Sequence, residues 1–127
     1  MHGLRRREAY AVRAQIGMVS HKPLLYENLS AIENLHFFAR LYNLPADTLE
    51  TRIKEMLNQV GLAKRGHDLV RTFSRGMQQR LSIARTIAIR PEVLLLDEPC
   101  ASIDPISSAK IEQTIDELKR DHTIIIV

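Results

Sequence analysis

The chain has 127 residues, 45% of them hydrophobic and 26% charged, which predicts one domain with a modest core. The net charge is +3, and because acidic and basic residues are mixed along the length, the sequence argues against a nucleic-acid partner, whose surface would need a basic patch. The single Cys100 excludes an internal disulfide and no apolar run approaches the roughly 20 residues that span a bilayer, so we expect a reducing, cytoplasmic setting.

The first third of the chain predicts a strand followed by a helix. Residues 14–20 form a short apolar run, and His21-Lys22-Pro23 ends it because proline cannot continue a strand ladder. Ser30 and Glu33 have the spacing of a capping box, which predicts a helix start. The helix should end near residues 43–45, and its apolar face should contain Ile32, Leu35, Phe38, Ala39 and Tyr42.

Two more helices are predicted in the middle of the chain. Residues 46–60 have helical periodicity, and Gly61 stands where a left-handed residue commonly ends a helix. The polar stretch 62–72 predicts a connection with one short helical turn. Ser74 then offers an N-cap to a helix that runs to about Ile89. The apolar positions are Leu49, Ile53, Met56, Leu57 and Val60 in the first helix, and Met77, Leu81, Ala84 and Ala88 in the second.

The last third predicts a strand, a helix and a second strand. Val93–Leu96 is a short apolar run, typical of a strand buried on both faces. Asp104 and Pro105 have the pattern of a helix start, and Thr123–Val127 is a β-branched run suited to a central parallel strand. The whole order of elements predicts an α/β fold with three helices inserted between parallel strands. The helix after Asp104 should run to Arg120 and bury Ile111, Ile115 and Leu118.

Two adjacent carboxylates, Asp97 and Glu98, directly follow the strand Val93–Leu96. Ligands of open parallel sheets bind beyond the carboxyl ends of strands, so this pair should face a site. Asp97 could hold a phosphate-bound magnesium ion, and Glu98 could polarise an attacking water. Taken alone, the pair is more typical of a loop cap beside a solvated glutamate.

The run Ser74–Arg80 supplies a second feature suited to phosphate. A serine hydroxyl, a glycine that permits close backbone approach and the free N–H groups of a helix start together favour an anion. By itself, Ser-x-Gly is more often an ordinary N-cap. Its combination with Asp97 and Glu98 favours a nucleotide site.

These residues resemble the nucleotide-binding domain of the ATP-binding cassette (ABC) family. Ser74–Arg80 is similar to the signature motif, Leu94–Glu98 to the Walker B strand with its catalytic glutamate, and residues 101–104 to the D-loop. The resemblance implies a P-loop NTPase-like parallel sheet with an inserted helical subdomain, truncated at both ends. Within residues 1–127, about 30–90 would form the helical subdomain with the signature motif, and about 91–127 the Walker B strand, D-loop and following strand.

The resemblance also implies ATP and Mg²⁺ as cofactors. Asp97 would serve the metal, Glu98 would be the general base, and Asp104 would couple the two sites of a head-to-tail dimer with a second nucleotide-binding subunit. His21 stands where the family has its Q-loop glutamine, and it can be functional or an exposed loop histidine. The residues expected at the nucleotide are Ser74, Arg75, Gly76, Met77, Gln78, His21 and Asp104.

The resemblance implies an ATP-hydrolysing subunit that powers transmembrane transport. It would sit peripherally at the cytoplasmic face of the inner (cell) membrane, with integral membrane subunits as partners. Residues 16–85 are similar to exporter-type ATPases for haem or drugs, and residues 99–127 to the ATPase of phosphate importers. The P-loop pattern G-x-x-x-x-G-K-[ST] does not occur in these 127 residues. The alternative is therefore a non-catalytic fragment or half-site that only supplies the signature surface to a partner ATPase.

Overall fold

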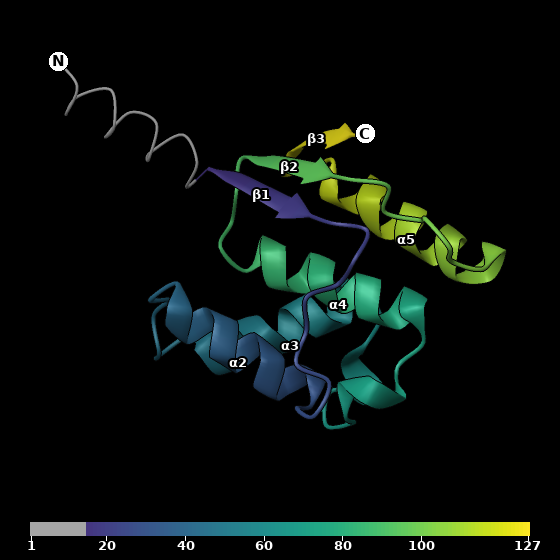
Figure 1. The fold of residues 1–127 in the computed structure, drawn as a ribbon. Coiled ribbons are helices and arrows are strands. Elements are labelled where there is room, and N and C mark those ends of the chain that lie inside the picture. The colour runs from purple at the N-terminus through teal and green to yellow at the C-terminus, as the bar shows by residue number, and fades with distance from the viewer. Residues whose placement is uncertain (1–14) are drawn as a thin grey trace, which may run out of the picture.

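The computed structural model describes residues 15–127 and confirms the predicted order of elements (Figure 1). Residue 14, the predicted start of the first strand, lies outside the described residues. The strands and helices in chain order are β1 (Ile16–Val19), α2 (Ala31–Leu41), α3 (Leu49–Gln59), α4 (Arg75–Ile87), β2 (Val93–Leu96), α5 (Pro105–Leu118) and β3 (Thr123–Ile126). Two single 3₁₀ turns, η1 (Ala63–Arg65) and η2 (Val70–Thr72), connect α3 to α4, where one turn was expected.

The three strands form a parallel sheet in the order β1-β2-β3. The register pairs Ile16 with Val93 and Val93 with Thr123. Within the described residues, β2 has a partner on each side and β3 pairs only with β2, so the suitability of Thr123–Val127 for a central strand stays a prediction. A β-branched composition favours any strand, and only tertiary pairing decides which strand is central.

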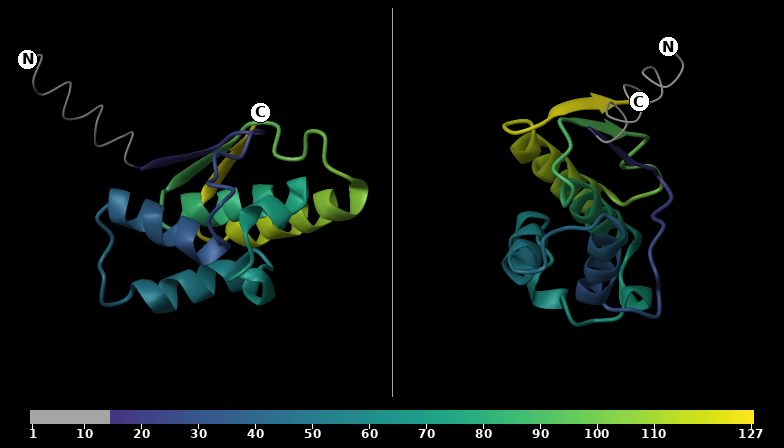
Figure 2. Two further views of the ribbon diagram at one scale, coloured as in Figure 1. Left: turned by 60° about the horizontal axis from the view of Figure 1, so that its bottom comes forward. Right: turned by 90° about the vertical axis from the view of Figure 1, so that its left-hand side faces the viewer.

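Within residues 15–127, the helices α2 to α5 lie on one side of the sheet, in two layers (Figure 2). The helices α4 and α5 lie next to the sheet, while α2 and α3 pack against α4 from the outer side. Because α4 is surrounded by the sheet and the other helices, it is buried on nearly all sides, and its core residues include Leu81, Ile83 and Ile87.

The opposite face of the sheet is uncovered among residues 15–127. Leu94 and Leu96 are fully buried against the helices, whereas Met18 on β1 is 56% exposed and Ile125 on β3 is 48% exposed. Alternate side chains of a strand point to opposite faces, so each strand buries one set and exposes the other. The prediction that Val93–Leu96 is buried on both faces is therefore wrong for its second face, where Val93 and Leu95 are only partly buried.

The predicted helix signals are confirmed in detail. Ser30 and Glu33 form the capping box of α2, since Ser30 Oγ accepts from Glu33 N–H and the Glu33 carboxylate accepts from Ser30 N–H. Gly61 follows α3 in the left-handed conformation, with φ +74°. Tyr42 was expected on the buried face of α2 but is 57% exposed, because α2 ends at Leu41.

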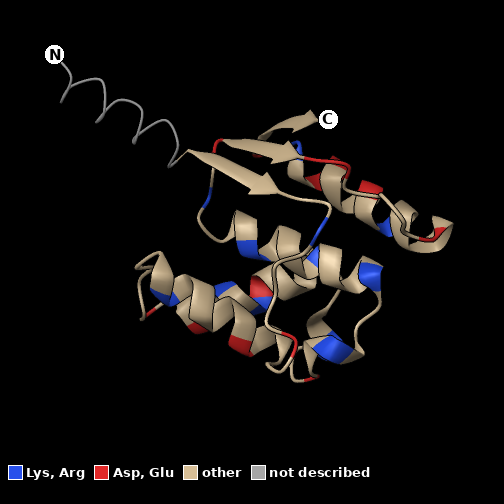
Figure 3. Cartoon of the chain, in the orientation of Figure 1, with Lys and Arg blue, Asp and Glu red and all other residues tan. Residues whose placement is uncertain are grey.

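Charges of both signs are spread over helices and loops (Figure 3). No helix of residues 15–127 is long and apolar enough to cross a membrane.

Candidate functional site

The carboxyl ends of β1 and β2 place two predicted site residues at one edge of the sheet. Asp97 follows β2, and its backbone N–H donates to the carbonyl of Val19 at the end of β1 (2.9 Å). The next residue, Glu98, donates its N–H to the carbonyl of Val127, beyond β3 (3.1 Å). The backbone of both carboxylate residues is thus fixed by the neighbouring strands, as expected for a site beyond the strand ends.

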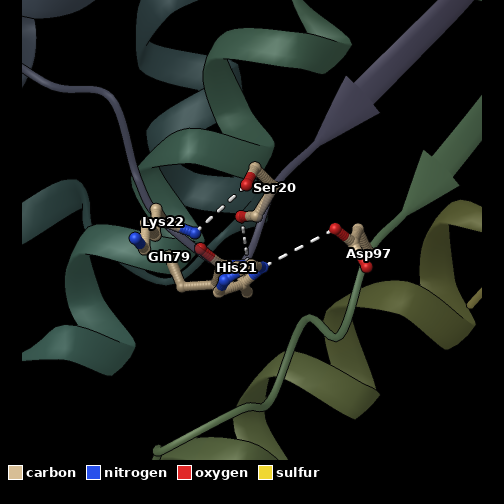
Figure 4. A network of polar contacts seen from close by, with 5 residues as sticks. All are labelled: Ser20, His21, Lys22, Gln79 and Asp97. Atoms are coloured by element: carbon tan, nitrogen blue, oxygen red, sulfur yellow. Dashed lines mark hydrogen bonds and ion pairs between the residues drawn. The ribbon is translucent and has the colours of Figure 1, made fainter.

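His21 and Asp97 face each other across this edge (Figure 4). His21 Nδ1 lies 3.6 Å from Asp97 Oδ2, and both side chains are about one-third exposed, at 38% and 35%. The Nδ1 atom itself is buried and has no hydrogen-bond partner. Residues that are far apart in the sequence thus form one cluster, which the sequence did not predict as a contact.

Gln79 from α4 joins this cluster and was not predicted as a site residue. Its Nε2 donates to the carbonyl of Ser20 (3.2 Å), and its side chain is almost fully buried (Figure 4). The N–H of Lys22 donates to Ser20 Oγ (3.3 Å), so the backbone on both sides of His21 is held. The sequence did contain a signal for this role, since Gln79 is a polar residue at a core position of α4. A buried glutamine needs a hydrogen-bond partner.

The chain turns sharply after Asp97. Glu98 is exposed and adopts a left-handed conformation with φ +44°, and Ser102 does the same with φ +59°. Such backbone conformations cost free energy in residues other than glycine and concentrate at functional sites. This turn directs the chain from the sheet edge into the loop before α5.

The signature-like run lies at the start of α4. Ser74 is the N-cap and its Oγ accepts from Met77 N–H (3.2 Å), as predicted. Arg75 is exposed and Met77 partly buried, while Gln78 Nε2 lies 3.5 Å from the carbonyl of Val70. Among the described contacts, none joins these four residues to Asp97, whereas Gln79 of α4 donates a hydrogen bond to Ser20 at the sheet edge.

Gly76 is needed for helix packing. A Cβ atom at this position would lie 2.5 Å from Ser107 Cβ and 2.8 Å from Ser107 Oγ. The starts of α4 and α5 therefore meet at a distance that only glycine permits. From the sequence, Gly76 was expected to let the backbone come close to a phosphate group, and that role stays a prediction.

We expect Gly76→Ala to destabilise the chain by about 1–3 kcal/mol, because overpacking outweighs the better helix propensity of alanine. Urea unfolding measures the change. The double variant Gly76→Ala/Ser107→Gly lacks the clashing Ser107 atoms. Its loss in free energy of unfolding should therefore be smaller than the sum of the losses of the two single variants. Additive effects would show that the two residues do not meet.

Asp104 is the N-cap of α5, where its Oδ2 accepts from Ser107 N–H (3.0 Å). This hydrogen bond lowers the pKa of the Asp104 carboxyl below its ordinary value. Pro105 occupies the first turn, as predicted. The structure thus gives Asp104 a capping role, and its coupling role across a dimer stays a prediction.

The lowered pKa of Asp104 predicts a pH dependence of stability. The folded state favours the ionised carboxyl, so the cap stabilises above the ordinary pKa and is lost as the pH falls through the lower, folded value. The stability difference between the wild type and Asp104→Ala should therefore be constant near neutrality and shrink below about pH 4. Thermal melts at several pH values measure it. Asp116→Ala, in an exposed ion pair on the same helix, is the control for general charge effects.

An apolar groove of about 670 Å³ opens beside the site, on the outer side of β1. Leu24 (74% exposed) and Tyr26 (49%) come from the loop after His21, and Tyr42 lies at the end of α2. Arg85 supports this loop by donating to the Leu24 carbonyl, and its guanidinium lies 4.6 Å from the centre of the Phe38 ring. The groove presents several exposed apolar side chains next to the His21 loop.

The donor set at the sheet edge fits a divalent cation held partly by other ligands. Asp97 offers a carboxylate, and His21 offers an orphaned buried nitrogen aimed at it. No group of three or more His, Cys, Asp or Glu side chains gathers around a metal position in the part of the chain that the structure describes. Water or phosphate oxygens would supply the other positions, which is usual for Mg²⁺.

Comparison with known proteins places these features in a family. The family model described as "ABC transporter" matches residues 1–101. The structure of cbiO1 from Clostridium perfringens, described as part of the ABC transporter complex cbiONQ, matches with a TM-score of 0.85 and 30% sequence identity. The match covers 95% of this chain and 49% of that chain, so the chain spans about half the length of that protein.

Proposed function

Since the chain belongs to the ABC transporter family, we propose that it is part of an ATP-binding subunit that hydrolyses ATP to power transmembrane transport. The observation that carries the proposal is the meeting of His21 and Asp97 where two parallel strands end. Glu98, exposed beside Asp97, adds a second carboxylate with room for a water molecule.

The proposed site uses the residues at the sheet edge in distinct roles. Asp97 would hold Mg²⁺, which, when bound, neutralises charge on the phosphates. Glu98 would accept a proton from the attacking water, a role that its exposed carboxylate permits. Gln79 keeps the His21 loop in place through Ser20, so it acts as a positioning residue.

The start of α4 supports a head-to-tail dimer. Ser74 and Arg75 are exposed, while Gly76 is buried against Ser107. A helix N-terminus attracts anions, so Ser74 and its neighbours could meet the phosphates of ATP held by a second subunit. Met77 and Gln78 would support this surface from the next turn.

The apolar groove beside β1 supports a membrane partner. Leu24 and Tyr26, in the loop that follows His21, form an exposed apolar surface together with Tyr42. Exposed apolar patches of this kind mark interaction surfaces. We place the chain at the cytoplasmic face of the membrane, with this groove against an integral membrane subunit. Residues from about 30 to 90 would then form the helical subdomain, and residues from about 91 to 127 would belong to the core. The cargo, whether phosphate or a compound of the export type, stays a prediction.

Nucleotide binding by the 127-residue chain tests the proposal. We expect ATP to bind in a Mg²⁺-dependent manner, and Asp97→Asn to weaken this binding in an equilibrium titration. Asp121→Asn is the matched control, because Asp121 is exposed at the opposite end of the sheet, before β3. Equal affinities of Asp97→Asn and the wild type would contradict the proposed site.

A second candidate function is a half-site that only supplies the signature surface. The exposure of Ser74 and Arg75 at the helix start favours it, because this surface is free to meet a nucleotide on a partner. The same titration separates the two functions. A half-site should bind no ATP alone and should raise hydrolysis by a partner ATPase, and Ser74→Ala should reduce that effect. Micromolar ATP binding without a partner would count against it.

A further inference from the structure

We infer that His21 Nδ1 and Asp97 Oδ2 bind the same divalent cation, and that this pair favours a transition ion such as Mn²⁺ over Mg²⁺. The inference rests on the proposed function, because it assigns the metal preference of that same site. It concerns the imidazole nitrogen that His21 places opposite Asp97 at the sheet edge.

The geometry of the pair suits a shared ion better than a direct contact. The 3.6 Å between Nδ1 and Oδ2 exceeds the usual 2.7–3.2 Å of a hydrogen bond. Two donors on one ion, each at roughly 2.0–2.2 Å from it, lie roughly 3 Å or slightly more apart. A small movement of either side chain therefore brings both atoms into the coordination range of one cation.

The imidazole nitrogen also lacks any other partner. Nδ1 is buried without a hydrogen bond, and buried polar atoms normally have a partner in the protein, in water or in a ligand. Gln79 Oε1 is a second buried atom without a partner in the same cluster. Two buried atoms without partners in one cluster mark a place where a ligand would complete the missing contacts.

Both ligands stand on backbone that is already fixed. Ser20, next to His21, is held by Gln79 and by the N–H of Lys22, while the N–H of Asp97 is bound to the end of β1. A preorganised pair loses little conformational freedom on binding a metal. This fixation gives a site with only two protein ligands a measurable affinity.

The chemistry of the donors sets the preference. Mg²⁺ strongly prefers oxygen ligands, whereas imidazole nitrogen suits transition ions and carboxylate suits Mg²⁺ and Mn²⁺ alike. A pair of one nitrogen and one carboxylate therefore gains more from Mn²⁺ than from Mg²⁺. The remaining positions stay open to water or phosphate oxygens, since no third metal-binding side chain joins the pair within residues 15–127.

Mn²⁺ electron spin echo measurements on the 127-residue chain, without nucleotide and slightly above neutral pH, test the inference. We expect modulation from an imidazole nitrogen in the wild type and its loss in His21→Gln. In titrations of the metal alone, His21→Gln should lower Mn²⁺ affinity by about tenfold. Even the loss of a residue that only hydrogen-bonds to a metal ligand typically lowers metal affinity by about 10–100-fold. Mg²⁺ affinity should change by less than about twofold, because Mg²⁺ gains little from nitrogen.

The control is His36→Gln. His36 Nε2 lies 3.0 Å from Glu50 Oε1, so this histidine already has a carboxylate partner at hydrogen-bond distance. Nitrogen modulation should persist in this variant. Absence of modulation in the wild type, its persistence in His21→Gln or its loss in His36→Gln would each overturn the inference. These measurements contain no nucleotide, so their results do not depend on ATP hydrolysis. Failure of the assembled ATPase to hydrolyse ATP would contradict the proposed function and leave the metal inference standing.

Discussion

Replacing Glu98 by glutamine should lower the rate of ATP hydrolysis by about 10²–10⁴-fold, the usual contribution of a general base. Glutamine keeps the size of the side chain and the exposed position after β2 but cannot accept a proton from water. Because glutamine has the same shape, the left-handed backbone at this position and the fold should be kept. Phosphate release by the assembled ATPase that contains this chain measures the rate.

Glu92→Gln is the control for this experiment. Glu92 is an exposed glutamate at the amino end of the same strand, so its replacement changes the same charge away from the site. We expect its rate to match the wild type. Nucleotide binding should survive in Glu98→Gln, because the proposed role lies in the chemical step. Equal hydrolysis by Glu98→Gln and the wild type would contradict the assignment of Glu98.

Asn34→Ala should reduce the free energy of unfolding by about 2–4 kcal/mol, because each buried polar group left unpaired costs about 1–3 kcal/mol. Asn34 is fully buried on α2, and its Oδ1 accepts from the N–H of Tyr26 (2.8 Å). Its Nδ2 donates to the carbonyls of Tyr26 and Ser30, each at 2.9 Å. One side chain thus fixes the loop between the His21 cluster and α2.

Asn28→Ala tests whether this effect belongs to the buried network. Asn28 lies in the same loop but is exposed, so its replacement should change the stability by less than about 0.5 kcal/mol. Urea unfolding of both variants measures the difference. A small effect of Asn34→Ala would mean that the loop keeps its shape without these hydrogen bonds.

The features that could be predicted depend on short stretches of chain. The capping box at Ser30, the N-cap at Ser74 and the Asp104-Pro105 start of α5 each involve residues three or fewer positions apart, so the sequence pattern contains the whole interaction. The strands Val93–Leu96 and Thr123–Ile126 were recognised for the same reason. The sequence thereby predicted the α/β fold.

The features that were missed depend on tertiary contacts. Gln79 reaches Ser20, and His21 reaches Asp97, only after the strands and α4 have packed together. The exposure of one face of the sheet is likewise set by which elements pack together. The role of Asn34 was also missed, because Tyr26, which its side chain binds, lies eight residues away in the preceding loop.

The pairing of β1 with β2 has a consequence for how this protein folds. The register joins Ile16 to Val93, so the parallel pair closes a loop that contains α2, α3 and α4. Closing a long loop costs entropy before its contacts form, whereas a helix forms from near neighbours. We expect pulsed hydrogen exchange during refolding to protect the amides of α2–α4 before those of β1. We therefore expect the meeting of His21 with Asp97 to be among the last events of folding.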